Sequence, residues 1–291
     1  MSERVFLIGP GHVGRGLYRA FRASGIEVLG LHGKRASAMA TSAGALPPEM
    51  ARANVIIVSV RDPQLDDAIE ELSAAARGGG VARGTVILHT SGIAEPAGLH
   101  SLTEAGFPGG TFHPLVPFVD PETSAELLRH GWVGIDGENE AKGASRRIAA
   151  HLGARTLDIP VGKKAAYHAA AVISSNFPVV LASVAGHLMH EIGIPESSAH
   201  QAVESLMSGA FSNMEQSLPD DVLTGPVVRG DAETLRKHLR ALQGHRDALE
   251  VYSALSAAAV DIAGRRGTSP KKMAALRGML RPPERRKDTE D

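Results

Sequence analysis

A glycine-rich run near the start of the chain has the composition of a loop that binds phosphate. It reads Gly9-Pro10-Gly11-His12-Val13-Gly14 and follows a short apolar run at residues 5–8. This spacing matches G-x-G-x-x-G, in which the first glycine makes a tight turn, the second admits a pyrophosphate to the backbone and the third lets helix and strand pack closely. A helix N-terminus also offers unpaired N–H groups to phosphates, so the run predicts a dinucleotide site. The simpler alternative is a structural turn whose glycines serve packing only.

The residues that follow the second predicted strand distinguish between the two nicotinamide dinucleotides. That strand covers residues 26–31 and has Glu27 at its beginning, whereas an NAD site places an acidic residue at the strand's end. His32, Lys34 and Arg35 stand at the end instead. Arginine binds a phosphate bidentately, so the sequence favours NADP (NADPH) over NAD. The plainer interpretation is that these cations belong to a solvated surface segment.

Further candidate ligand contacts follow the next predicted strands. Loops at the carboxyl ends of parallel strands border the ligand crevice, so their side chains can contact adenosine, ribose or phosphate. The cofactor candidates there are Val60, Arg61, Thr90 and Ser91. His113 follows the fifth predicted strand and is a candidate substrate contact, acid or orienting residue. A histidine that merely fixes the loop by hydrogen bonds is an equally good interpretation.

A second group of chemically capable side chains begins the longest apolar segment of the chain. Lys164, His168 and Ser175 fall on one face of a helix, and Asn176 lies close to that face. Burial disfavours the charged form of a lysine, which suits proton donation near neutral pH. Lys164, His168 and Asn176 are therefore candidate catalytic residues, and Ser175 is a candidate substrate contact. Alternatively, Lys164 extends to solvent and His168 is a core histidine with its hydrogen bonds satisfied.

A third candidate segment, residues 223–231, reads Leu-Thr-Gly-Pro-Val-Val-Arg-Gly-Asp. Its glycines and proline predict a stiff loop. Thr224 and Arg229 are candidate substrate-binding residues, and Arg229 could hold a substrate carboxylate or pin two domains together. Asp231 is expected to cap the helix that follows.

These motifs require a framework of alternating strands and helices. Apolar runs are found at residues 5–8, 26–31, 55–60, 85–89, 111–112 and 132–135, and helical patterns at 11–23, 36–43, 65–76 and 141–151. This alternation predicts an α/β fold, a doubly wound Rossmann domain with a mainly parallel sheet. Only helical patterns follow, at residues 163–192, 197–217, 231–243, 245–266 and 269–279. We expect an NADP-binding domain at 1–160, an all-α substrate and dimerisation domain at 161–280, and a flexible charged tail at 281–291.

Composition excludes several other functions. The chain has 291 residues, 31 Lys+Arg against 32 Asp+Glu, and no cysteine. A formal net charge of −1 argues against a dedicated nucleic-acid binder, and the absence of cysteine excludes disulfides, thiolate nucleophiles and iron–sulfur ligation. His187, His190 and Glu191 could meet around a metal, but they stand at the end of the long helical pattern, so no metal site is predicted.

The same long helical pattern resembles a membrane span in its length and its lack of charge. No Asp, Glu, Lys or Arg stands between Lys164 and Glu191, which is enough chain to cross a bilayer. The segment nevertheless holds His168, Asn176 and other polar side chains, which are costly in a membrane and argue for a helix buried in protein. With no export signal and no cysteine, the expected compartment is the cytoplasm, without a membrane.

Several of these segments together resemble one bacterial protein family. They are the run from Lys164 through Tyr167-His168 to Ser175-Asn176-Phe177, the 223–231 segment, His89-Thr90-Ser91-Gly92 and the His-Pro-Leu-Val-Pro-Phe run at 113–118. The family combines a Rossmann-like domain with the domain of unknown function 2520 (DUF2520), and the resemblance spans nearly the whole chain. It is similar to ketopantoate reductase, pyrroline-5-carboxylate reductase, and the 6-phosphogluconate and hydroxyisobutyrate dehydrogenases. The resemblance implies NADP-linked reduction of a small keto acid or imine, a 6-phosphogluconate dehydrogenase-like C-terminal domain, and a homodimer joined through it.

The chain departs from those relatives at the proton donor. In the hydroxyacid dehydrogenases and ketopantoate reductase, an asparagine follows the catalytic lysine by four residues, whereas here His168 holds that place and Asn176 comes later. Lys163 stands where the family has an acidic residue. The donor therefore stays open between Lys164 and His168. We expect an NADP-dependent oxidoreductase that transfers a hydride to a small carbonyl or imine, such as the 2-oxo acid ketopantoate; the alternative is a non-catalytic NADP-binding sensor or partner-binding protein.

Overall fold

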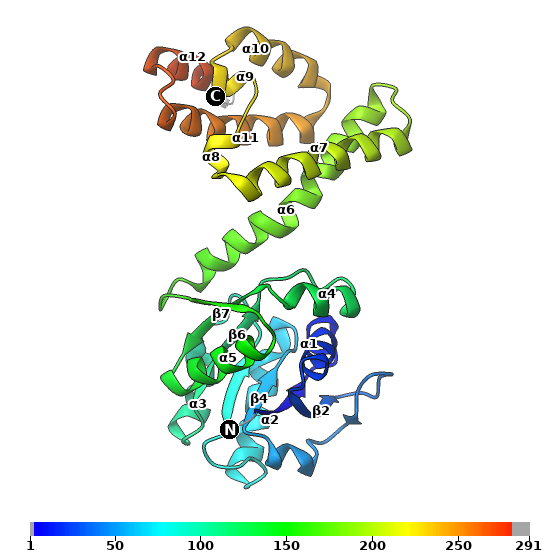
Figure 1. Cartoon of the computed structure of the whole chain (residues 1–291), viewed down its shortest axis with the longest axis vertical. Helices are drawn as coiled ribbons and strands as arrows, with labels where there is room; N and C mark the ends of the chain where they lie inside the picture. Colours follow the sequence, from blue (N-terminus) through cyan, green and yellow to red (C-terminus); the bar gives the residue numbers. More distant parts are fainter. Residues whose placement is uncertain (1–2, 281–291) are drawn as a thin grey trace, which may run out of the picture. The chain divides into compact units, whose positions relative to one another are not determined.

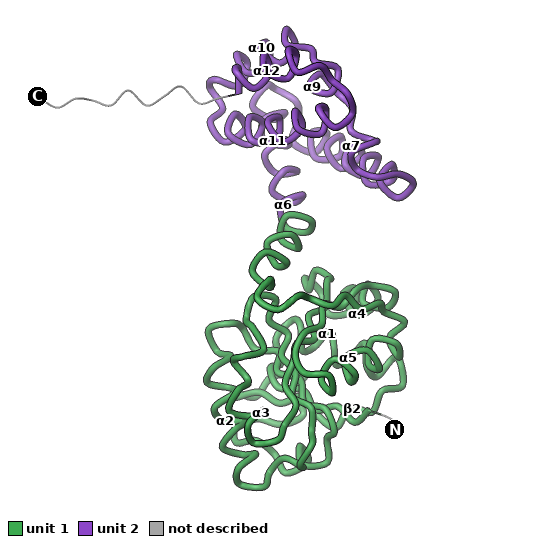
Figure 2. The backbone as a smooth tube through the Cα atoms, turned by 90° about the vertical axis from the view of Figure 1, so that its left-hand side faces the viewer, with its two compact units in different colours: residues 1–176 green, residues 177–291 purple. Residues whose placement is uncertain are grey.

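The computed structural model describes residues 3–280 of the chain. The chain divides into two compact units, residues 1–176 and residues 177–291 (Figure 2). The division falls inside the long helix α6 (Lys164–Glu191), whose first turns belong to the first unit. The domain boundary predicted at residue 160 precedes this helix, and the charged tail predicted at 281–291 lies outside the described residues.

The first unit is built on one sheet with helices packed around it (Figure 1). The sheet has eight strands in the order β3-β2-β1-β4-β5-β6-β7-β8. The strands are β1 (Arg4–Ile8), β2 (Glu27–Gly33), β3 (Ser42–Ala43), β4 (Val55–Val58), β5 (Val86–His89), β6 (Gly109–Pro114), β7 (Trp132–Gly137) and β8 (Arg155–Asp158). All neighbouring pairs are parallel except β6 and β7. The predicted α/β class with a mainly parallel sheet is confirmed. Strand order reverses at β1, which pairs with β2 on one side and β4 on the other, and ligands bind doubly wound sheets at such a switch point.

Helices cover both faces of this sheet because alternate strand residues point to opposite faces. They are α1 (His12–Ala23), α2 (Leu65–Arg77), α3 (His100–Glu104), α4 (Pro121–Leu128) and α5 (Asn139–His151), with 3-10 turns η1 (Pro48–Arg52), η2 (Asp62–Gln64) and η3 (Pro96–Leu99). In β1, Val5 and Leu7 pack in the core cluster that holds α1 and α5, whereas Phe6 and Ile8 pack in the cluster that holds α2 and α3. Burying each such side chain contributes about 1.5–3 kcal/mol.

The structure corrects the prediction of a helix at residues 36–43. That segment is irregular and ends in the short edge strand β3. The Thr41 hydroxyl accepts a hydrogen bond from the backbone N–H of Leu31 on β2, which holds the segment beside the sheet. Helices α3 and α4 and strand β8 were not predicted, although Asp120 before Pro121 is a recognisable helix start and accepts a bond from the Thr123 N–H.

Up to residue 280 the second unit contains helices and no strand, as predicted. After α6 it contains α7 (Glu196–Gln216), α8 (Pro219–Val222), α9 (Pro226–Arg229), α10 (Ala232–Ala241), η4 (Leu242–Gly244), α11 (Arg246–Arg265) and α12 (Pro270–Leu280). Val227, Leu235, Val260 and Leu276 form a small buried core. The segment predicted as a stiff loop contains the single turn α9, and the Asp231 carboxylate caps α10 through the Thr234 N–H, as expected.

Helix α6 exposes an apolar surface that the single chain does not cover. Among the described residues it is the one helix long and apolar enough to span a membrane, a test that the core helices of soluble proteins also pass. The expectation that it is buried is wrong for the single chain, since its most apolar window is 0% buried and Val179 is 70% exposed. Apolar surface of this extent marks a contact site for another molecule.

Candidate functional site

The glycine turn between β1 and α1 has the geometry of a phosphate-binding loop. Gly9 has φ of +107°, and its N–H donates to the carbonyl of His32 at 2.8 Å. A Cβ at Gly14 would overlap the Gly9 carbonyl oxygen, so only glycine lets the helix approach the turn this closely. A Cβ at Gly11 would meet nothing within 4 Å. The open space over Gly11, at the N-terminus of a twelve-residue helix, is therefore where a pyrophosphate can approach the backbone.

A cavity of about 400 Å³ opens beside this turn, within the first unit. Its lining includes the predicted cofactor residues Gly9, Pro10, Gly11, His32, Lys34, Arg35, Val60 and Arg61. Asp67 and Glu71 of α2 also line it, and they were not predicted. Three cations against two carboxylates leave a positive balance, and Glu71 lies 4.0 Å from Lys34 Nζ. The cavity can hold an anionic adenosine end, although part of its positive charge is already paired.

His32 lines this cavity, but both of its ring nitrogens already have partners within the protein. Its Nε2 lies 3.2 Å from the carbonyl of Gly44, and its Nδ1 lies 3.0 Å from Ser42 Oγ. A carbonyl only accepts, so Nε2 carries the hydrogen and Nδ1 accepts from the serine. The ring therefore fastens β3 to β2.

Lys164 is fully buried, which is one of the two alternatives that the sequence left open. Its Nζ donates to the carbonyl of Ser91 at 3.0 Å and to Thr111 Oγ1 at 2.7 Å. Burial lowers the pKa of Lys164 to about 8, although the negative charge of Asp136 opposes the shift. The ammonium group thus joins α6 to the loop after β5 and to the middle of β6.

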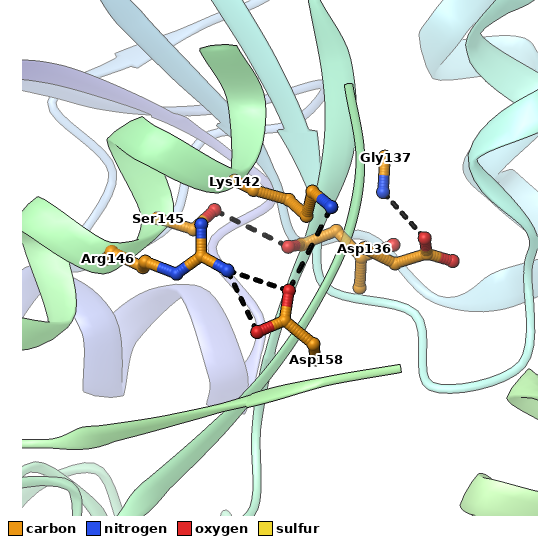
Figure 3. Close-up of polar contacts among 7 residues, drawn as sticks. Asp136, Gly137, Lys142, Ser145, Arg146 and Asp158 are labelled. Atoms are coloured by element: carbon orange, nitrogen blue, oxygen red, sulfur yellow. Dashed lines mark hydrogen bonds and ion pairs between the residues drawn. The ribbon is translucent and has the colours of Figure 1, made fainter. Parts of the chain in front are cut away.

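The carboxylates of Asp136 on β7 and Asp158 on β8 have different partners (Figure 3). Asp158 on β8 binds Arg146 at 2.7 Å and lies 3.9 Å from Lys142, so its charge is paired with α5. One oxygen of Asp136 accepts the Gly137 N–H at 2.7 Å, and its Oδ2 is buried without a hydrogen-bond partner among residues 3–280. Asp136 makes the largest carboxylate contribution to the field at Lys164, ahead of Glu95 and Asp62.

A buried histidine that the sequence did not single out completes this polar layer. His89 is 1% exposed, and its Nε2 lies 3.4 Å from Thr111 Oγ1. Burial, together with the charge of Lys164, lowers the pKa of His89 to about 3, so the ring is neutral near pH 7. Its Nδ1 has no partner in the described part of the chain. The sequence could have indicated His89 as a site residue, because it directly precedes the predicted residues Thr90 and Ser91.

Two further ring side chains lie beside this layer with the predicted His113. His113 Nδ1 is 2.8 Å from the Tyr167 hydroxyl, and the His113 and His168 rings meet edge to face with centroids 5.8 Å apart. Burial, together with the charges of His168 and Lys164, lowers the pKa of His113 to about 4. The structure thus brings together predicted residues from β6 and α6, and it adds Tyr167, which sequence reasoning missed.

The remaining predicted site residues do not belong to the group of rings formed by His113, Tyr167 and His168. Ser91 Oγ accepts the Ala94 N–H at 2.9 Å, which shapes the loop after β5, and Thr90 beside it is buried. Ser175 and Asn176 are exposed at the end of the first unit. Thr224 and Arg229 belong to the second unit, around α9. The functional roles of all these residues stay predictions.

The metal site considered at the end of α6 is not formed. Glu191 pairs with His245 at 2.5 Å, and His187 Nδ1 lies 2.8 Å from the carbonyl of Ser183. Across residues 3–280, no group of three or more histidine and acidic side chains is placed to hold a metal ion.

Comparison with known proteins agrees with this arrangement. Residues 132–259 match the family model described as Domain of unknown function (DUF2520). The resemblance stated from the sequence is thereby confirmed for this part of the chain. No curated protein matches the chain.

Solved structures show the same fold over almost the whole chain. Protein TM1727 from Thermotoga maritima has a TM-score of 0.70 and 22% identity over 91% of this chain and 100% of its own. A reductive aminase from Aspergillus terreus, in complex with NADPH and ethyl levulinate, has a TM-score of 0.60 and 17% identity. The match covers 97% of this chain and 100% of the aminase chain. A pyrroline-5-carboxylate reductase from Coxiella burnetii has a TM-score of 0.59 and 14% identity. The match covers 92% of this chain and 100% of the reductase chain. At these identities the likeness shows a shared fold.

Proposed function

We propose that this protein is an NADPH-dependent oxidoreductase that transfers a hydride to a small carbonyl or imine substrate. The observation that carries the proposal is the open space over Gly11, which adjoins the cavity lined by Lys34, Arg35 and Arg61. The N–H groups of the helix N-terminus suit a pyrophosphate, and the cations suit a 2′-phosphate. Proteins of the same fold include reductases crystallised with NADP or NADPH.

Within this proposal, the adenosine end lies in the cavity and the nicotinamide extends toward the carboxyl ends of β4 and β5. Thr90 and Ser91 follow β5, and Lys164, His113 and His168 lie next to that loop. When bound, NADPH supplies the hydride, and these residues supply proton donors and a positive field. The substrate class follows from that pairing of a hydride source with proton donors, because both are needed to reduce a C=O or C=N bond.

The cofactor proposal is tested by titration of the purified chain with NADPH and with NADH, followed through quenching of the single tryptophan or through calorimetry. We expect NADPH to bind at least tenfold more tightly, and we expect Lys34→Ala and Arg35→Ala each to weaken NADPH about tenfold. Arg77→Ala, at an exposed arginine of α2 outside the cavity, is the matched control. Equal affinities for the two dinucleotides in the wild type would overturn the preference.

The reductase proposal is tested by NADPH oxidation across a panel of 2-oxo acids, including ketopantoate, and cyclic imines. Turnover of any member supports it. Tight NADPH binding with no turnover across the panel would contradict it and favour the non-catalytic sensor.

The proposal extends to a homodimer joined through the helical unit. A groove of about 420 Å³ between α6 and α7 is lined only by apolar side chains, with Leu206 68% exposed. Its lining residues are Pro178, Leu181, Ala185, Met189, Val203, Leu206, Met207, Ala210, Phe211 and Met214. A second copy of the chain would present the same apolar surface in return, as two-fold symmetric interfaces require. The polar side chains spaced along α6, including His168 and Asn176, favour this occupant over a lipid bilayer.

A further inference from the structure

Two partly buried histidines lie together where the substrate of the proposed reductase would bind. A Cβ at Gly92, on the loop after β5, would overlap the His168 ring and lie 2.8 Å from His113 Nε2. Both rings therefore abut this loop, and glycine is what admits them. Ligands of doubly wound sheets bind outside the carboxyl ends of the strands, and this loop begins at such an end.

Tyr167 fixes the orientation of His113. Its hydroxyl lies 2.8 Å from His113 Nδ1, and the two rings meet at 78°. Burial raises the pKa of Tyr167, so the phenol keeps its proton. The hydroxyl and Nδ1 share one hydrogen bond, whose direction follows the tautomer of the neutral ring. A Cβ at Gly134 would overlap the Tyr167 hydroxyl, so β7 leaves a space that this hydroxyl fills.

Lys164 is unsuited to touch a substrate. Its side chain is 0% exposed, and its Nζ is already bonded to Ser91 and Thr111. Transfer of a proton requires the donor to lie within hydrogen-bond reach of the reacting atom, directly or through one water. Lys164 instead holds the loop after β5 against the middle of β6. Its positive charge helps to keep His113 neutral.

We propose that His168 is the proton donor of the reaction, and that Tyr167 and His113 are positioning residues that hold its ring. The inference rests on the proposed reductase function. The carbonyl or imine carbon accepts the hydride that NADPH supplies, which forms a C–H bond and leaves NADP⁺. The π electron pair moves to the oxygen or nitrogen, which takes the proton from the His168 imidazolium. That N–H bond breaks, the substrate is reduced, and neutral His168 regains a proton from water.

The first test compares single-turnover rates with whichever substrate of the panel the wild type reduces. His168→Gln is expected to lower the rate at least a hundredfold with NADPH affinity unchanged, and added imidazole is expected to restore part of the rate in His168→Ala. Lys164→Met is expected to keep at least a tenth of the rate. His100→Gln, at an exposed histidine of α3 that pairs with Glu104, is the matched control. Full activity in His168→Gln would overturn the assignment alone, whereas a wild type without turnover would overturn the reductase proposal and the assignment with it.

The second test pairs an NMR titration, which needs neither substrate nor cofactor, with a rate measurement on a Tyr167 variant. The positive charge of His168 lowers the pKa of His113, so His168→Gln is expected to shift the NMR titration of the His113 ring to higher pH than in the wild type. In Tyr167→Phe, which removes the hydroxyl but keeps the ring, the hydride-transfer rate is expected to fall about tenfold while NADPH affinity stays the same. A His113 titration that His168→Gln leaves unmoved would contradict the pairing of the two histidines.

Discussion

The ammonium group of Lys164 donates a hydrogen bond to the hydroxyl of Thr111 at 2.7 Å, across 53 residues of sequence. This bond joins the first turn of α6 to the middle of β6. The same Thr111 hydroxyl lies 3.4 Å from Nε2 of the neutral His89. A positive charge is thus held in a buried polar layer, where the low dielectric makes its field stronger than it would be in water.

Lys164 is expected to make the free energy of unfolding depend on pH in the alkaline range. Its pKa is about 8 when folded, against the usual 10.5 that the unfolded chain keeps. Between these values the unfolded state binds more protons, so the free energy of unfolding rises with pH; below about pH 8 both states are protonated and the contribution is constant. The expected gain is on the order of 3 kcal/mol between pH 8 and 10.5.

Urea unfolding of the wild type and Lys164→Met at several pH values measures this gain as the difference between the two proteins. Lys163→Met, at the exposed neighbour, is the control and should follow the wild type. Identical pH profiles for Lys164→Met and the wild type would show that Lys164 keeps its ordinary pKa in the fold.

Substitution by alanine is expected to lower NADPH affinity at Gly11 and protein stability at Gly14. Gly11→Ala places its methyl group in open space at a helix N-cap with φ of −75°, so stability should change by less than about 1 kcal/mol, while NADPH affinity should fall at least tenfold. Gly14→Ala drives its methyl group into the Gly9 carbonyl and should destabilise the fold by several kcal/mol. Thermal unfolding and NADPH titration of both variants separate the two effects. Unchanged NADPH affinity in a folded Gly11→Ala would remove the phosphate site from this turn.

The carboxylate of Glu71 is expected to weaken cofactor binding. It lies 4.0 Å from Lys34 Nζ and lines the same cavity, so it competes with a 2′-phosphate for that cation. Glu71→Gln should tighten NADPH about two- to fivefold, with little effect on NADH and a smaller gain at high salt. Glu70→Gln, on the same helix but outside the cavity, should leave both affinities unchanged. Equal tightening by both variants would indicate a general charge effect.

What the sequence could predict depended on local spacing. The glycine turn follows from three glycines within six residues after an apolar run. The uncharged helix that Lys164 begins made its burial one of two alternatives. Asp231 could be recognised as a helix cap because it precedes a helical pattern. Each of these inferences needs only residues that are neighbours along the chain.

What could not be predicted depended on the register between distant strands. His113 on β6 pairs with Gly134 on the antiparallel strand β7, and the missing side chain at Gly134 leaves the space that the Tyr167 hydroxyl fills. No spacing within α6 indicates that Tyr167, rather than Lys164, bonds His113. Glu71 on α2 likewise lines the same cavity as the end of β2, and the strand order that brings them together emerges from the whole sheet.

The exposed groove between α6 and α7 leads to a prediction about the assembly. If a second copy covers it, a charge placed there must be buried without a partner, which costs several kcal/mol. Leu206→Glu is therefore expected to convert a dimer into a monomer in sedimentation or light scattering at micromolar concentration, with the circular dichroism of a folded chain retained because Leu206 is 68% exposed in the single chain. Val119→Glu, at an 81% exposed position of the first unit outside the groove, should stay dimeric. A wild type that is monomeric throughout this range, or a Leu206→Glu variant that stays dimeric, would mean that another molecule covers α6 and α7.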